Sequence, residues 1–121
     1  MNRVVHFELG AVDPLRAVEF YKNVFGWQAQ QWGGEEYWIM KTGTSPEMGI
    51  DGAVLRNKDS QPRTVNSISV SSIEEYAAKV EQHGGKVVVP KMTVPTVGYL
   101  AYCNDTEGNI FGIFQPDGSA R

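Results

Sequence analysis

The chain has little of several things that mark specialised classes of protein. Its 121 residues include a single cysteine, Cys103. No internal disulfide can form, which favours a reducing compartment and a buried structural thiol. No apolar run approaches the roughly 18 residues that a membrane-spanning helix needs, and the first residues lack the layout of a secretory signal. The sequence therefore predicts a cytoplasmic protein with no membrane partner.

Runs of basic residues are absent as well. The 11 lysines and arginines are scattered among 14 acidic residues, giving a net charge of -3. A phosphate backbone would find no positive footprint on such a chain, so we expect no nucleic-acid partner. With 41% hydrophobic and 21% charged residues, the composition is that of an ordinary globular chain. We expect one domain, residues 1–121.

The first half of the chain predicts a strand, a helix and three more strands. Residues 3–9 are rich in strand formers and lead to Asp13 and Pro14, an N-cap and a proline suited to the first helical position. Apolar residues at helical spacing follow, and Gly26 is the expected helix stop. The three strand signals that come next cover residues 27–32, 36–42 and 48–55.

The second half predicts the same order of elements. A strand over residues 64–70 precedes a helix opened by Ser72, with Glu75 three residues later, and Gly85 is its expected stop. The strand signals after it cover residues 86–89, 98–103 and 109–115. Residues 90–98 form a proline-punctuated connection, either a loop that covers a pocket or the span of a wide strand crossing.

Three pairs of punctuation residues come into register when the halves are superposed at one offset of 59 residues. The pairs are Asp13 with Ser72, Gly26 with Gly85, and Gly49 with Gly108. A single offset that aligns helix caps, helix stops and strand-preceding glycines indicates an internal duplication. We therefore predict two β-α-β-β-β modules, residues 1–56 and 64–117.

Five segments of the chain together carry a family resemblance. They are Val5–Leu9, Asp13–Tyr21, Phe25–Trp27, Val80–Lys86 and Asp105–Gly112. The chain resembles the vicinal oxygen chelate superfamily, the group of glyoxalases, bleomycin-resistance proteins and extradiol dioxygenases, over essentially its whole length. It is most similar to the small glyoxalase-like proteins. The resemblance implies an α+β fold in which two βαβββ modules form half-barrels around a shared cavity, and it implies a homodimer.

In the metalloenzymes of that superfamily the metal ligands come from the first and last strand of each module. The resemblance places these positions at His6, Ala53, Val65 and Gly112. Only the histidine has a lone pair to offer, whereas a catalytic divalent cation needs at least three protein donors. We therefore expect no metal and no cofactor.

A displaced metal site is the alternative. Its ligands would be His6, Glu8, Asp51 and Asn66. Such a site would make the protein a divalent-metal-dependent lyase, isomerase or dioxygenase.

His6 and Glu8 are the candidate catalytic residues. They stand two apart on one strand and so share a face, which by the resemblance lines the cavity. A carboxylate beside an imidazole raises the pKa of the imidazole and orients it as a general acid or base. The plainer interpretation is that the two residues hydrogen-bond each other and the backbone at a pocket wall or subunit contact.

The expected ligand is a small organic molecule, flat or apolar and held by few polar groups. The candidate ligand-binding residues are Ser67, Ser69, Tyr102, Phe114 and Trp38. The aromatic residues serve equally well as core or dimer interface. Three functions stay open at this point: a metal-free binding protein or acid-base enzyme, the displaced-metal enzyme, and an interaction module without a ligand.

Overall fold

The computed structural model describes residues 1–57, 59 and 61–121, and over these it contains eight strands and two helices. In chain order they are β1 (Val4–Ala11), α1 (Pro14–Phe25), β2 (Gln28–Gln31), β3 (Tyr37–Lys41), β4 (Gly52–Arg56), β5 (Arg63–Ser69), α2 (Ile73–Gln82), β6 (Lys86–Val94), β7 (Gly98–Asn104) and β8 (Ile110–Pro116). The order β-α-β-β-β occurs twice, which confirms the predicted α+β class.

The chain forms two compact units. The first unit is His6–Val65, and the second unit combines Met1–Val5 with Asn66–Arg121. The five N-terminal residues join the second unit through two backbone hydrogen bonds: Asn2 N donates to Ser69 O at 2.7 Å, and Ser69 N donates to Arg3 O at 2.9 Å. The boundary between the units therefore falls within strands β1 and β5.

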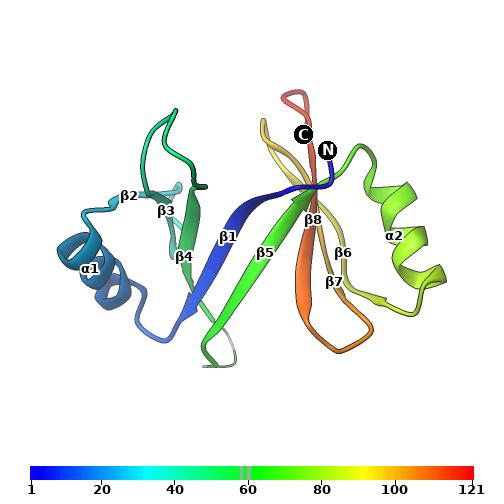
Figure 1. Ribbon diagram of the computed structural model, residues 1–121, viewed down its shortest axis with the longest axis horizontal. Coiled ribbons are helices and arrows are strands. Elements are labelled where there is room, and N and C mark those ends of the chain that lie inside the picture. The colour runs from blue at the N-terminus through cyan, green and yellow to red at the C-terminus, as the bar shows by residue number, and fades with distance from the viewer. Residues whose placement is uncertain (58, 60) are drawn as a thin grey trace. The chain divides into compact units, whose positions relative to one another are not determined.

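In the first unit the strands follow the order β2-β3-β4-β1, with β1 parallel to β4 and the other pairs antiparallel. Helix α1 lies on one side of these strands (Figure 1). Between helix and sheet, Val18, Met40 and Val54 form a buried cluster. Tyr21 stacks on Trp27 at the edge of this cluster, with 4.8 Å between ring centroids. The other face of the sheet carries no helix of this unit.

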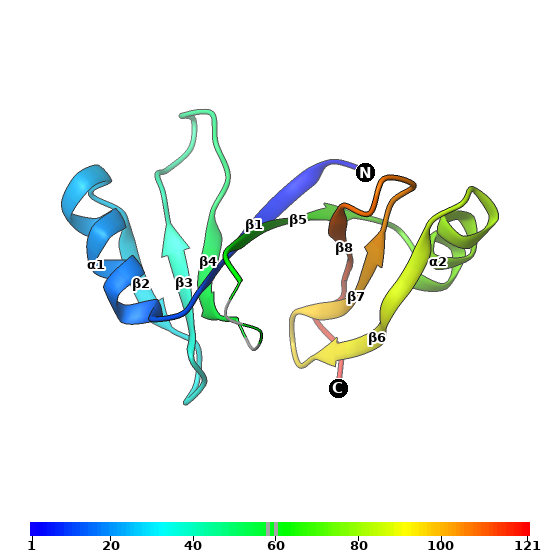
Figure 2. The same ribbon diagram turned by 90° about the horizontal axis from the view of Figure 1, so that it is seen from below.

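The second unit repeats the arrangement. Its strands follow the order β5-β8-β7-β6, with β5 parallel to β8, and α2 lies beside them (Figure 2). Its buried cluster consists of Val70, Ile73, Ala101, Cys103 and Ile113. Cys103 is fully buried, as predicted, and burial raises the pKa of its thiol.

The strand register is the same in the two halves. Glu8 pairs with Ala53 in the first parallel ladder, and Ser67 pairs with Gly112 in the second. Both partners of the second pair lie 59 residues after those of the first. The offset that aligned the punctuation residues therefore also aligns the backbone pairing.

The two helices begin as predicted and end differently. Asp13 accepts a hydrogen bond from Arg16 N, and Ser72 accepts one from Glu75 N. Gly26 ends α1 in the left-handed conformation (φ 75°), whereas in the second half the left-handed glycine is Gly84 (φ 93°). The expected equivalence of Gly26 and Gly85 is therefore wrong by one residue, because α2 is shorter than α1.

Strand β6 corrects a second expectation. It continues to Val94 through Pro90, with two register shifts against β7, and only Pro95, Thr96 and Val97 form the turn. An edge strand tolerates proline because one row of its backbone groups has no strand partner. The predicted nine-residue connection is therefore mostly strand. None of the helices described here is long and apolar enough to cross a membrane.

Candidate functional site

The candidate site lies on the face of the first unit's sheet that is opposite α1. His6 and Glu8 point to this face from β1, where Glu8 pairs with Ala53, and Ala53 pairs in turn with Ile39 of β3. Strand alternation then places Tyr37, two residues before Ile39, on the same face. Three strands thus bring two polar residues of β1 and one of β3 together.

A chain of two hydrogen bonds joins these residues. Tyr37 Oη donates to Glu8 Oε2 at 3.0 Å, and His6 Nε2 lies 3.0 Å from Tyr37 Oη. A phenol has one hydrogen, and Tyr37 gives it to the carboxylate, so its oxygen accepts a hydrogen bond from His6. The proton of the neutral imidazole is therefore on Nε2, and Nδ1 carries the lone pair.

Burial and charge act in opposite directions on His6. Burial of the ring lowers its pKa below 6.5, and the charges of Glu8 and Asp51 offset only part of this effect. The expectation that a neighbouring carboxylate dominates and raises the pKa is therefore wrong, because desolvation of the partly buried imidazolium costs more. The neutral imidazole is the favoured form at neutral pH.

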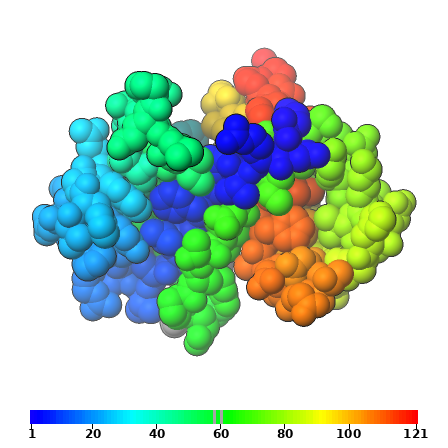
Figure 3. All heavy atoms as spheres, in the orientation of Figure 1, coloured from blue at the N-terminus to red at the C-terminus, as the bar shows by residue number. Residues whose placement is uncertain are grey.

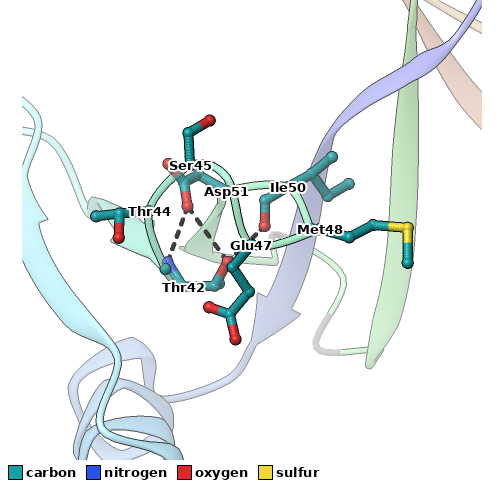
Figure 4. Close-up of a pocket in the computed structure, with 9 residues that line it drawn as sticks. Thr42, Thr44, Ser45, Glu47, Met48, Ile50 and Asp51 are labelled. Carbon is teal, nitrogen blue, oxygen red and sulfur yellow. Dashed lines mark hydrogen bonds between the residues drawn. The ribbon is translucent and has the colours of Figure 1, made fainter.

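Asp51 is fixed at the start of β4 by Thr42. Its Oδ1 accepts from Thr42 N at 2.8 Å and from Thr42 Oγ1 at 3.2 Å (Figure 4). These contacts hold a second carboxylate at the end of β4, where it acts electrostatically on His6. Both acidic groups that act on the ring thus come from the same unit as the ring.

The loop between β3 and β4 contains a separate pocket of about 320 Å³. Its lining consists of Thr42, Gly43, Thr44, Ser45, Glu47, Met48, Gly49, Ile50 and Asp51 (Figure 4). This loop stands at the surface of the unit (Figure 3), and its Met48 is 97% exposed. The pocket includes neither of the predicted catalytic residues.

Trp38 lies on the opposite face of β3 from Tyr37. There it packs against the buried cluster of Met40 and Val54, on the side of α1. The aromatic residue of β3 that contacts His6 and Glu8 is the neighbouring Tyr37, which the sequence analysis did not select. The alternation of Tyr37, Ile39 and Lys41 was the signal for it, but its use requires the register of β3 against β4.

The other predicted ligand-binding residues share one face of the second unit's sheet. Ser67 pairs with Gly112, which also pairs with Tyr102, and Ser69 pairs with Phe114. Ser67 is 3% exposed, and the Oγ of Ser69 contacts Met1 Sδ at 3.4 Å. The structure therefore brings these four residues together on the face opposite α2.

The residues at the superfamily's metal-ligand positions do not fit a metal. Ala53 is fully buried and offers a methyl group. At Gly112 even a Cβ atom would lie 2.5 Å from Ser67 Oγ, so the backbone leaves no room for a ligating side chain. Asn66, a member of the displaced set, lies on the α2 side of its strand, opposite Ser67. In the parts of the chain that the structure describes, no three His, Cys, Asp or Glu side chains gather around one point.

Comparison with known proteins agrees with this fold and geometry. The sequence profile of the Glyoxalase/Bleomycin resistance protein/Dioxygenase superfamily matches residues 3–113, and the chain belongs to this superfamily. A glyoxylase-like domain-containing protein of Didymella fabae is 29% identical over 118 residues, which are 93% of this chain and 92% of that protein.

Two solved structures show the same fold. The methylmalonyl-CoA epimerase of Mycobacterium tuberculosis superposes with a TM-score of 0.68 at 12% identity, covering 94% of this chain and 87% of that one. A variant of the Streptomyces coelicolor epimerase in complex with 2-nitronate-propionyl-CoA gives 0.69 at 13% identity, covering 100% and 99%. At these identities the likeness concerns the fold and not the reaction.

Proposed function

We propose that this protein binds a small organic molecule without a metal ion, and that His6 is the group that accepts a hydrogen bond or a proton from it. The observation that carries the proposal is the hydrogen-bonded chain from His6 through Tyr37 to Glu8. The donor-poor side chains at the superfamily's metal positions support its metal-free part.

Each residue of the chain has a separate task. Glu8 orients the Tyr37 hydroxyl, and Tyr37 in turn keeps the proton of His6 on Nε2. The lone pair of Nδ1 is then available to a ligand. When Nδ1 takes up a proton from the ligand, the positive charge that forms on the ring is stabilised through Tyr37 by the carboxylate of Glu8. This arrangement is that of a general base that needs no metal.

The remaining sequence predictions complete the proposal. Ser67, Ser69, Tyr102 and Phe114 contact the ligand from a cavity that the two halves share, and the protein is a cytoplasmic homodimer. The superfamily membership and the common face of these four residues support this part. The two neighbours named above provide a precedent for organic ligands, since one is titled as a complex with a CoA ester analogue.

The metal-free part is tested by elemental analysis of untagged protein, with thermal shifts on addition of zinc, nickel, manganese and iron. We expect no stoichiometric metal and no shift that depends on His6. Bound metal that disappears in His6→Gln would contradict the proposal and support the displaced-metal enzyme.

The binding part is tested by NMR on the imidazole nitrogens of His6, with neutral aromatic fragments added at millimolar concentration. We expect the free protein to show a protonated Nε2 and an unprotonated Nδ1, and we expect fragments to shift Nδ1. In Tyr37→Phe the tautomer loses its fixed partner and both nitrogens become averaged. Tyr21→Phe is the matched control, since Tyr21 packs against α1 residues and Trp27. A proton on Nδ1 in the free protein, or no response of His6 to any fragment, would contradict the proposal.

A further inference from the structure

We infer that the ligand at His6 presents a hydrogen-bond donor, as an alcohol, phenol or ammonium group, and that the site discriminates against carboxylates. This inference rests on the proposed function and names the class of molecule that the site accepts. It distinguishes the site from a binding site for organic acids, although the fold is the same as that of proteins whose ligands are acyl-CoA compounds.

The first argument is the direction of the hydrogen bonds. The proton of the neutral His6 ring is committed to Tyr37, which leaves Nδ1 as an acceptor that faces the ligand without a proton. Tyr37 gives its own hydrogen to Glu8. A carboxylate has lone pairs and no hydrogen, so it meets a lone pair on His6 and a phenol whose proton is already used. An alcohol or ammonium supplies the hydrogen that this arrangement lacks.

The second argument is charge. Glu8 is 7% exposed, and its carboxylate acts on His6 together with that of Asp51. The cation on this face of β3 is Lys41, which is exposed and separated from β1 by strand β4, about 10 Å at ordinary strand spacing. Two nearer carboxylates against one distant ammonium give the surroundings of His6 a negative potential. An anionic ligand is repelled there and a cationic one is attracted.

The third argument concerns the rest of the ligand. Between His6 and Tyr37 the face is floored by the methyl of Ala53, which is fully buried, with Ile39 and Leu55 beside it. These side chains form no hydrogen bonds, so the part of the ligand that lies over them is apolar. The class that fits is an apolar or aromatic body with one donor group.

Benzyl alcohol, benzylamine and benzoate test the inference on the full chain, because they share one ring and differ in the head group. Binding is followed through the ring nitrogens of His6, and the exposed His83 serves as an internal control in the same spectra. We expect the alcohol and the amine to shift His6, and benzoate to bind at least about tenfold more weakly than the alcohol.

Glu8→Gln keeps the size of the side chain and removes its charge. We expect this variant to lose most of the preference for benzylamine over benzoate. Asp51→Asn is the companion variant, and it keeps an oxygen that accepts from Thr42. Its expected effect has the same direction and is smaller, since Asp51 is exposed.

The outcomes separate this inference from the proposed function. Benzoate that shifts His6 as strongly as benzyl alcohol would overturn the inferred ligand class and leave metal-free binding intact. An unchanged preference in both charge variants would overturn the electrostatic argument. If none of the three compounds shifts His6, metal-free binding at this face fails, and the inferred class fails with it.

Discussion

The face of β1 and β3 that is opposite α1 carries His6, Glu8 and Tyr37. At the equivalent positions of β5 and β7 stand Val65, Ser67 and Leu100, because Tyr37 pairs with Leu55 and Leu100 pairs with Phe114, the residue 59 positions after Leu55. The backbone register of the two halves is the same, yet every ionisable side chain of the first face has a non-ionisable counterpart. The duplication has therefore preserved the strand pairing, while acid-base chemistry is confined to one half.

Stability provides the strongest test of the equivalence. Val54 and Ile113 stand 59 residues apart, each in the buried cluster of its own half and each at most 2% exposed. We expect Ile113→Ala to lower the free energy of unfolding by about 2–5 kcal/mol. Val54→Ala should cost roughly two-thirds as much, since valine loses two carbons where isoleucine loses three.

Urea denaturation measures both values, and Val88→Ala on the exposed part of β6 is the control, with an expected change within about 0.5 kcal/mol. A large loss in one half and none in the other would show that the two clusters do not play the same role.

A smaller effect is expected at the centre of the second face. A Cβ on Gly112 would meet Ser67 Oγ at 2.5 Å and Ser67 Cβ at 3.3 Å. Gly112→Ala should therefore cost about 1–2 kcal/mol, and Ser67→Ala in the same chain should restore most of it by removing the hydroxyl. Thermal or urea unfolding of the two single variants and the double variant measures the coupling. Strictly additive losses would mean that the contact does not limit this position.

The smallest effect concerns pH, and it separates the two histidines. Burial lowers the pKa of folded His6 below its unfolded value of 6.5. The unfolded chain then binds the proton first, so the contribution of His6 is complete above pH 6.5 and is lost as the pH falls below it. In His6→Gln the free energy of unfolding should fall less between about pH 7.5 and pH 5 than in the parent.

His83→Gln is the matched control, because His83 is exposed at the end of α2. It should leave the slope of the parent unchanged. An equal loss of slope in both variants would mean that burial of His6 does not determine the pH dependence. The carboxyls of Asp105 and Asp117, whose pKa values are lowered by hydrogen bonds from neighbouring residues, act only below pH 3.8 and do not interfere.

Local chemistry made much of the fold predictable. Asp13 and Ser72 are caps whose side chains bond the first turn of their own helices, and such contacts depend on only four residues. The missed part of β6 depends on its place at the sheet edge, where Pro90 is harmless, and a sequence does not state which strand is at an edge. The same limit explains why the helix stop was assigned to Gly85 when Gly84 adopts the left-handed conformation.

The candidate site was half predictable for a related reason. His6 and Glu8 share a face because of alternation along one strand, which the sequence shows directly. Tyr37 reaches them from β3, and its neighbour Trp38 has the same aromatic character and the opposite direction. Choosing between the two requires the register of β3 against β4, a long-range pairing that no local pattern contains.

The shared strand β1 has a consequence for synthesis of the chain. The first unit is contiguous from His6 to Val65, so its contacts are all available once these residues have left the ribosome. Asn2 and Arg3 bond Ser69, so Met1–Val5 have no partner strand until β5 has been made. Exposed valines at positions 4 and 5 therefore remain uncovered during this interval, which makes the N-terminus the segment of the nascent chain with the longest wait for its native contacts.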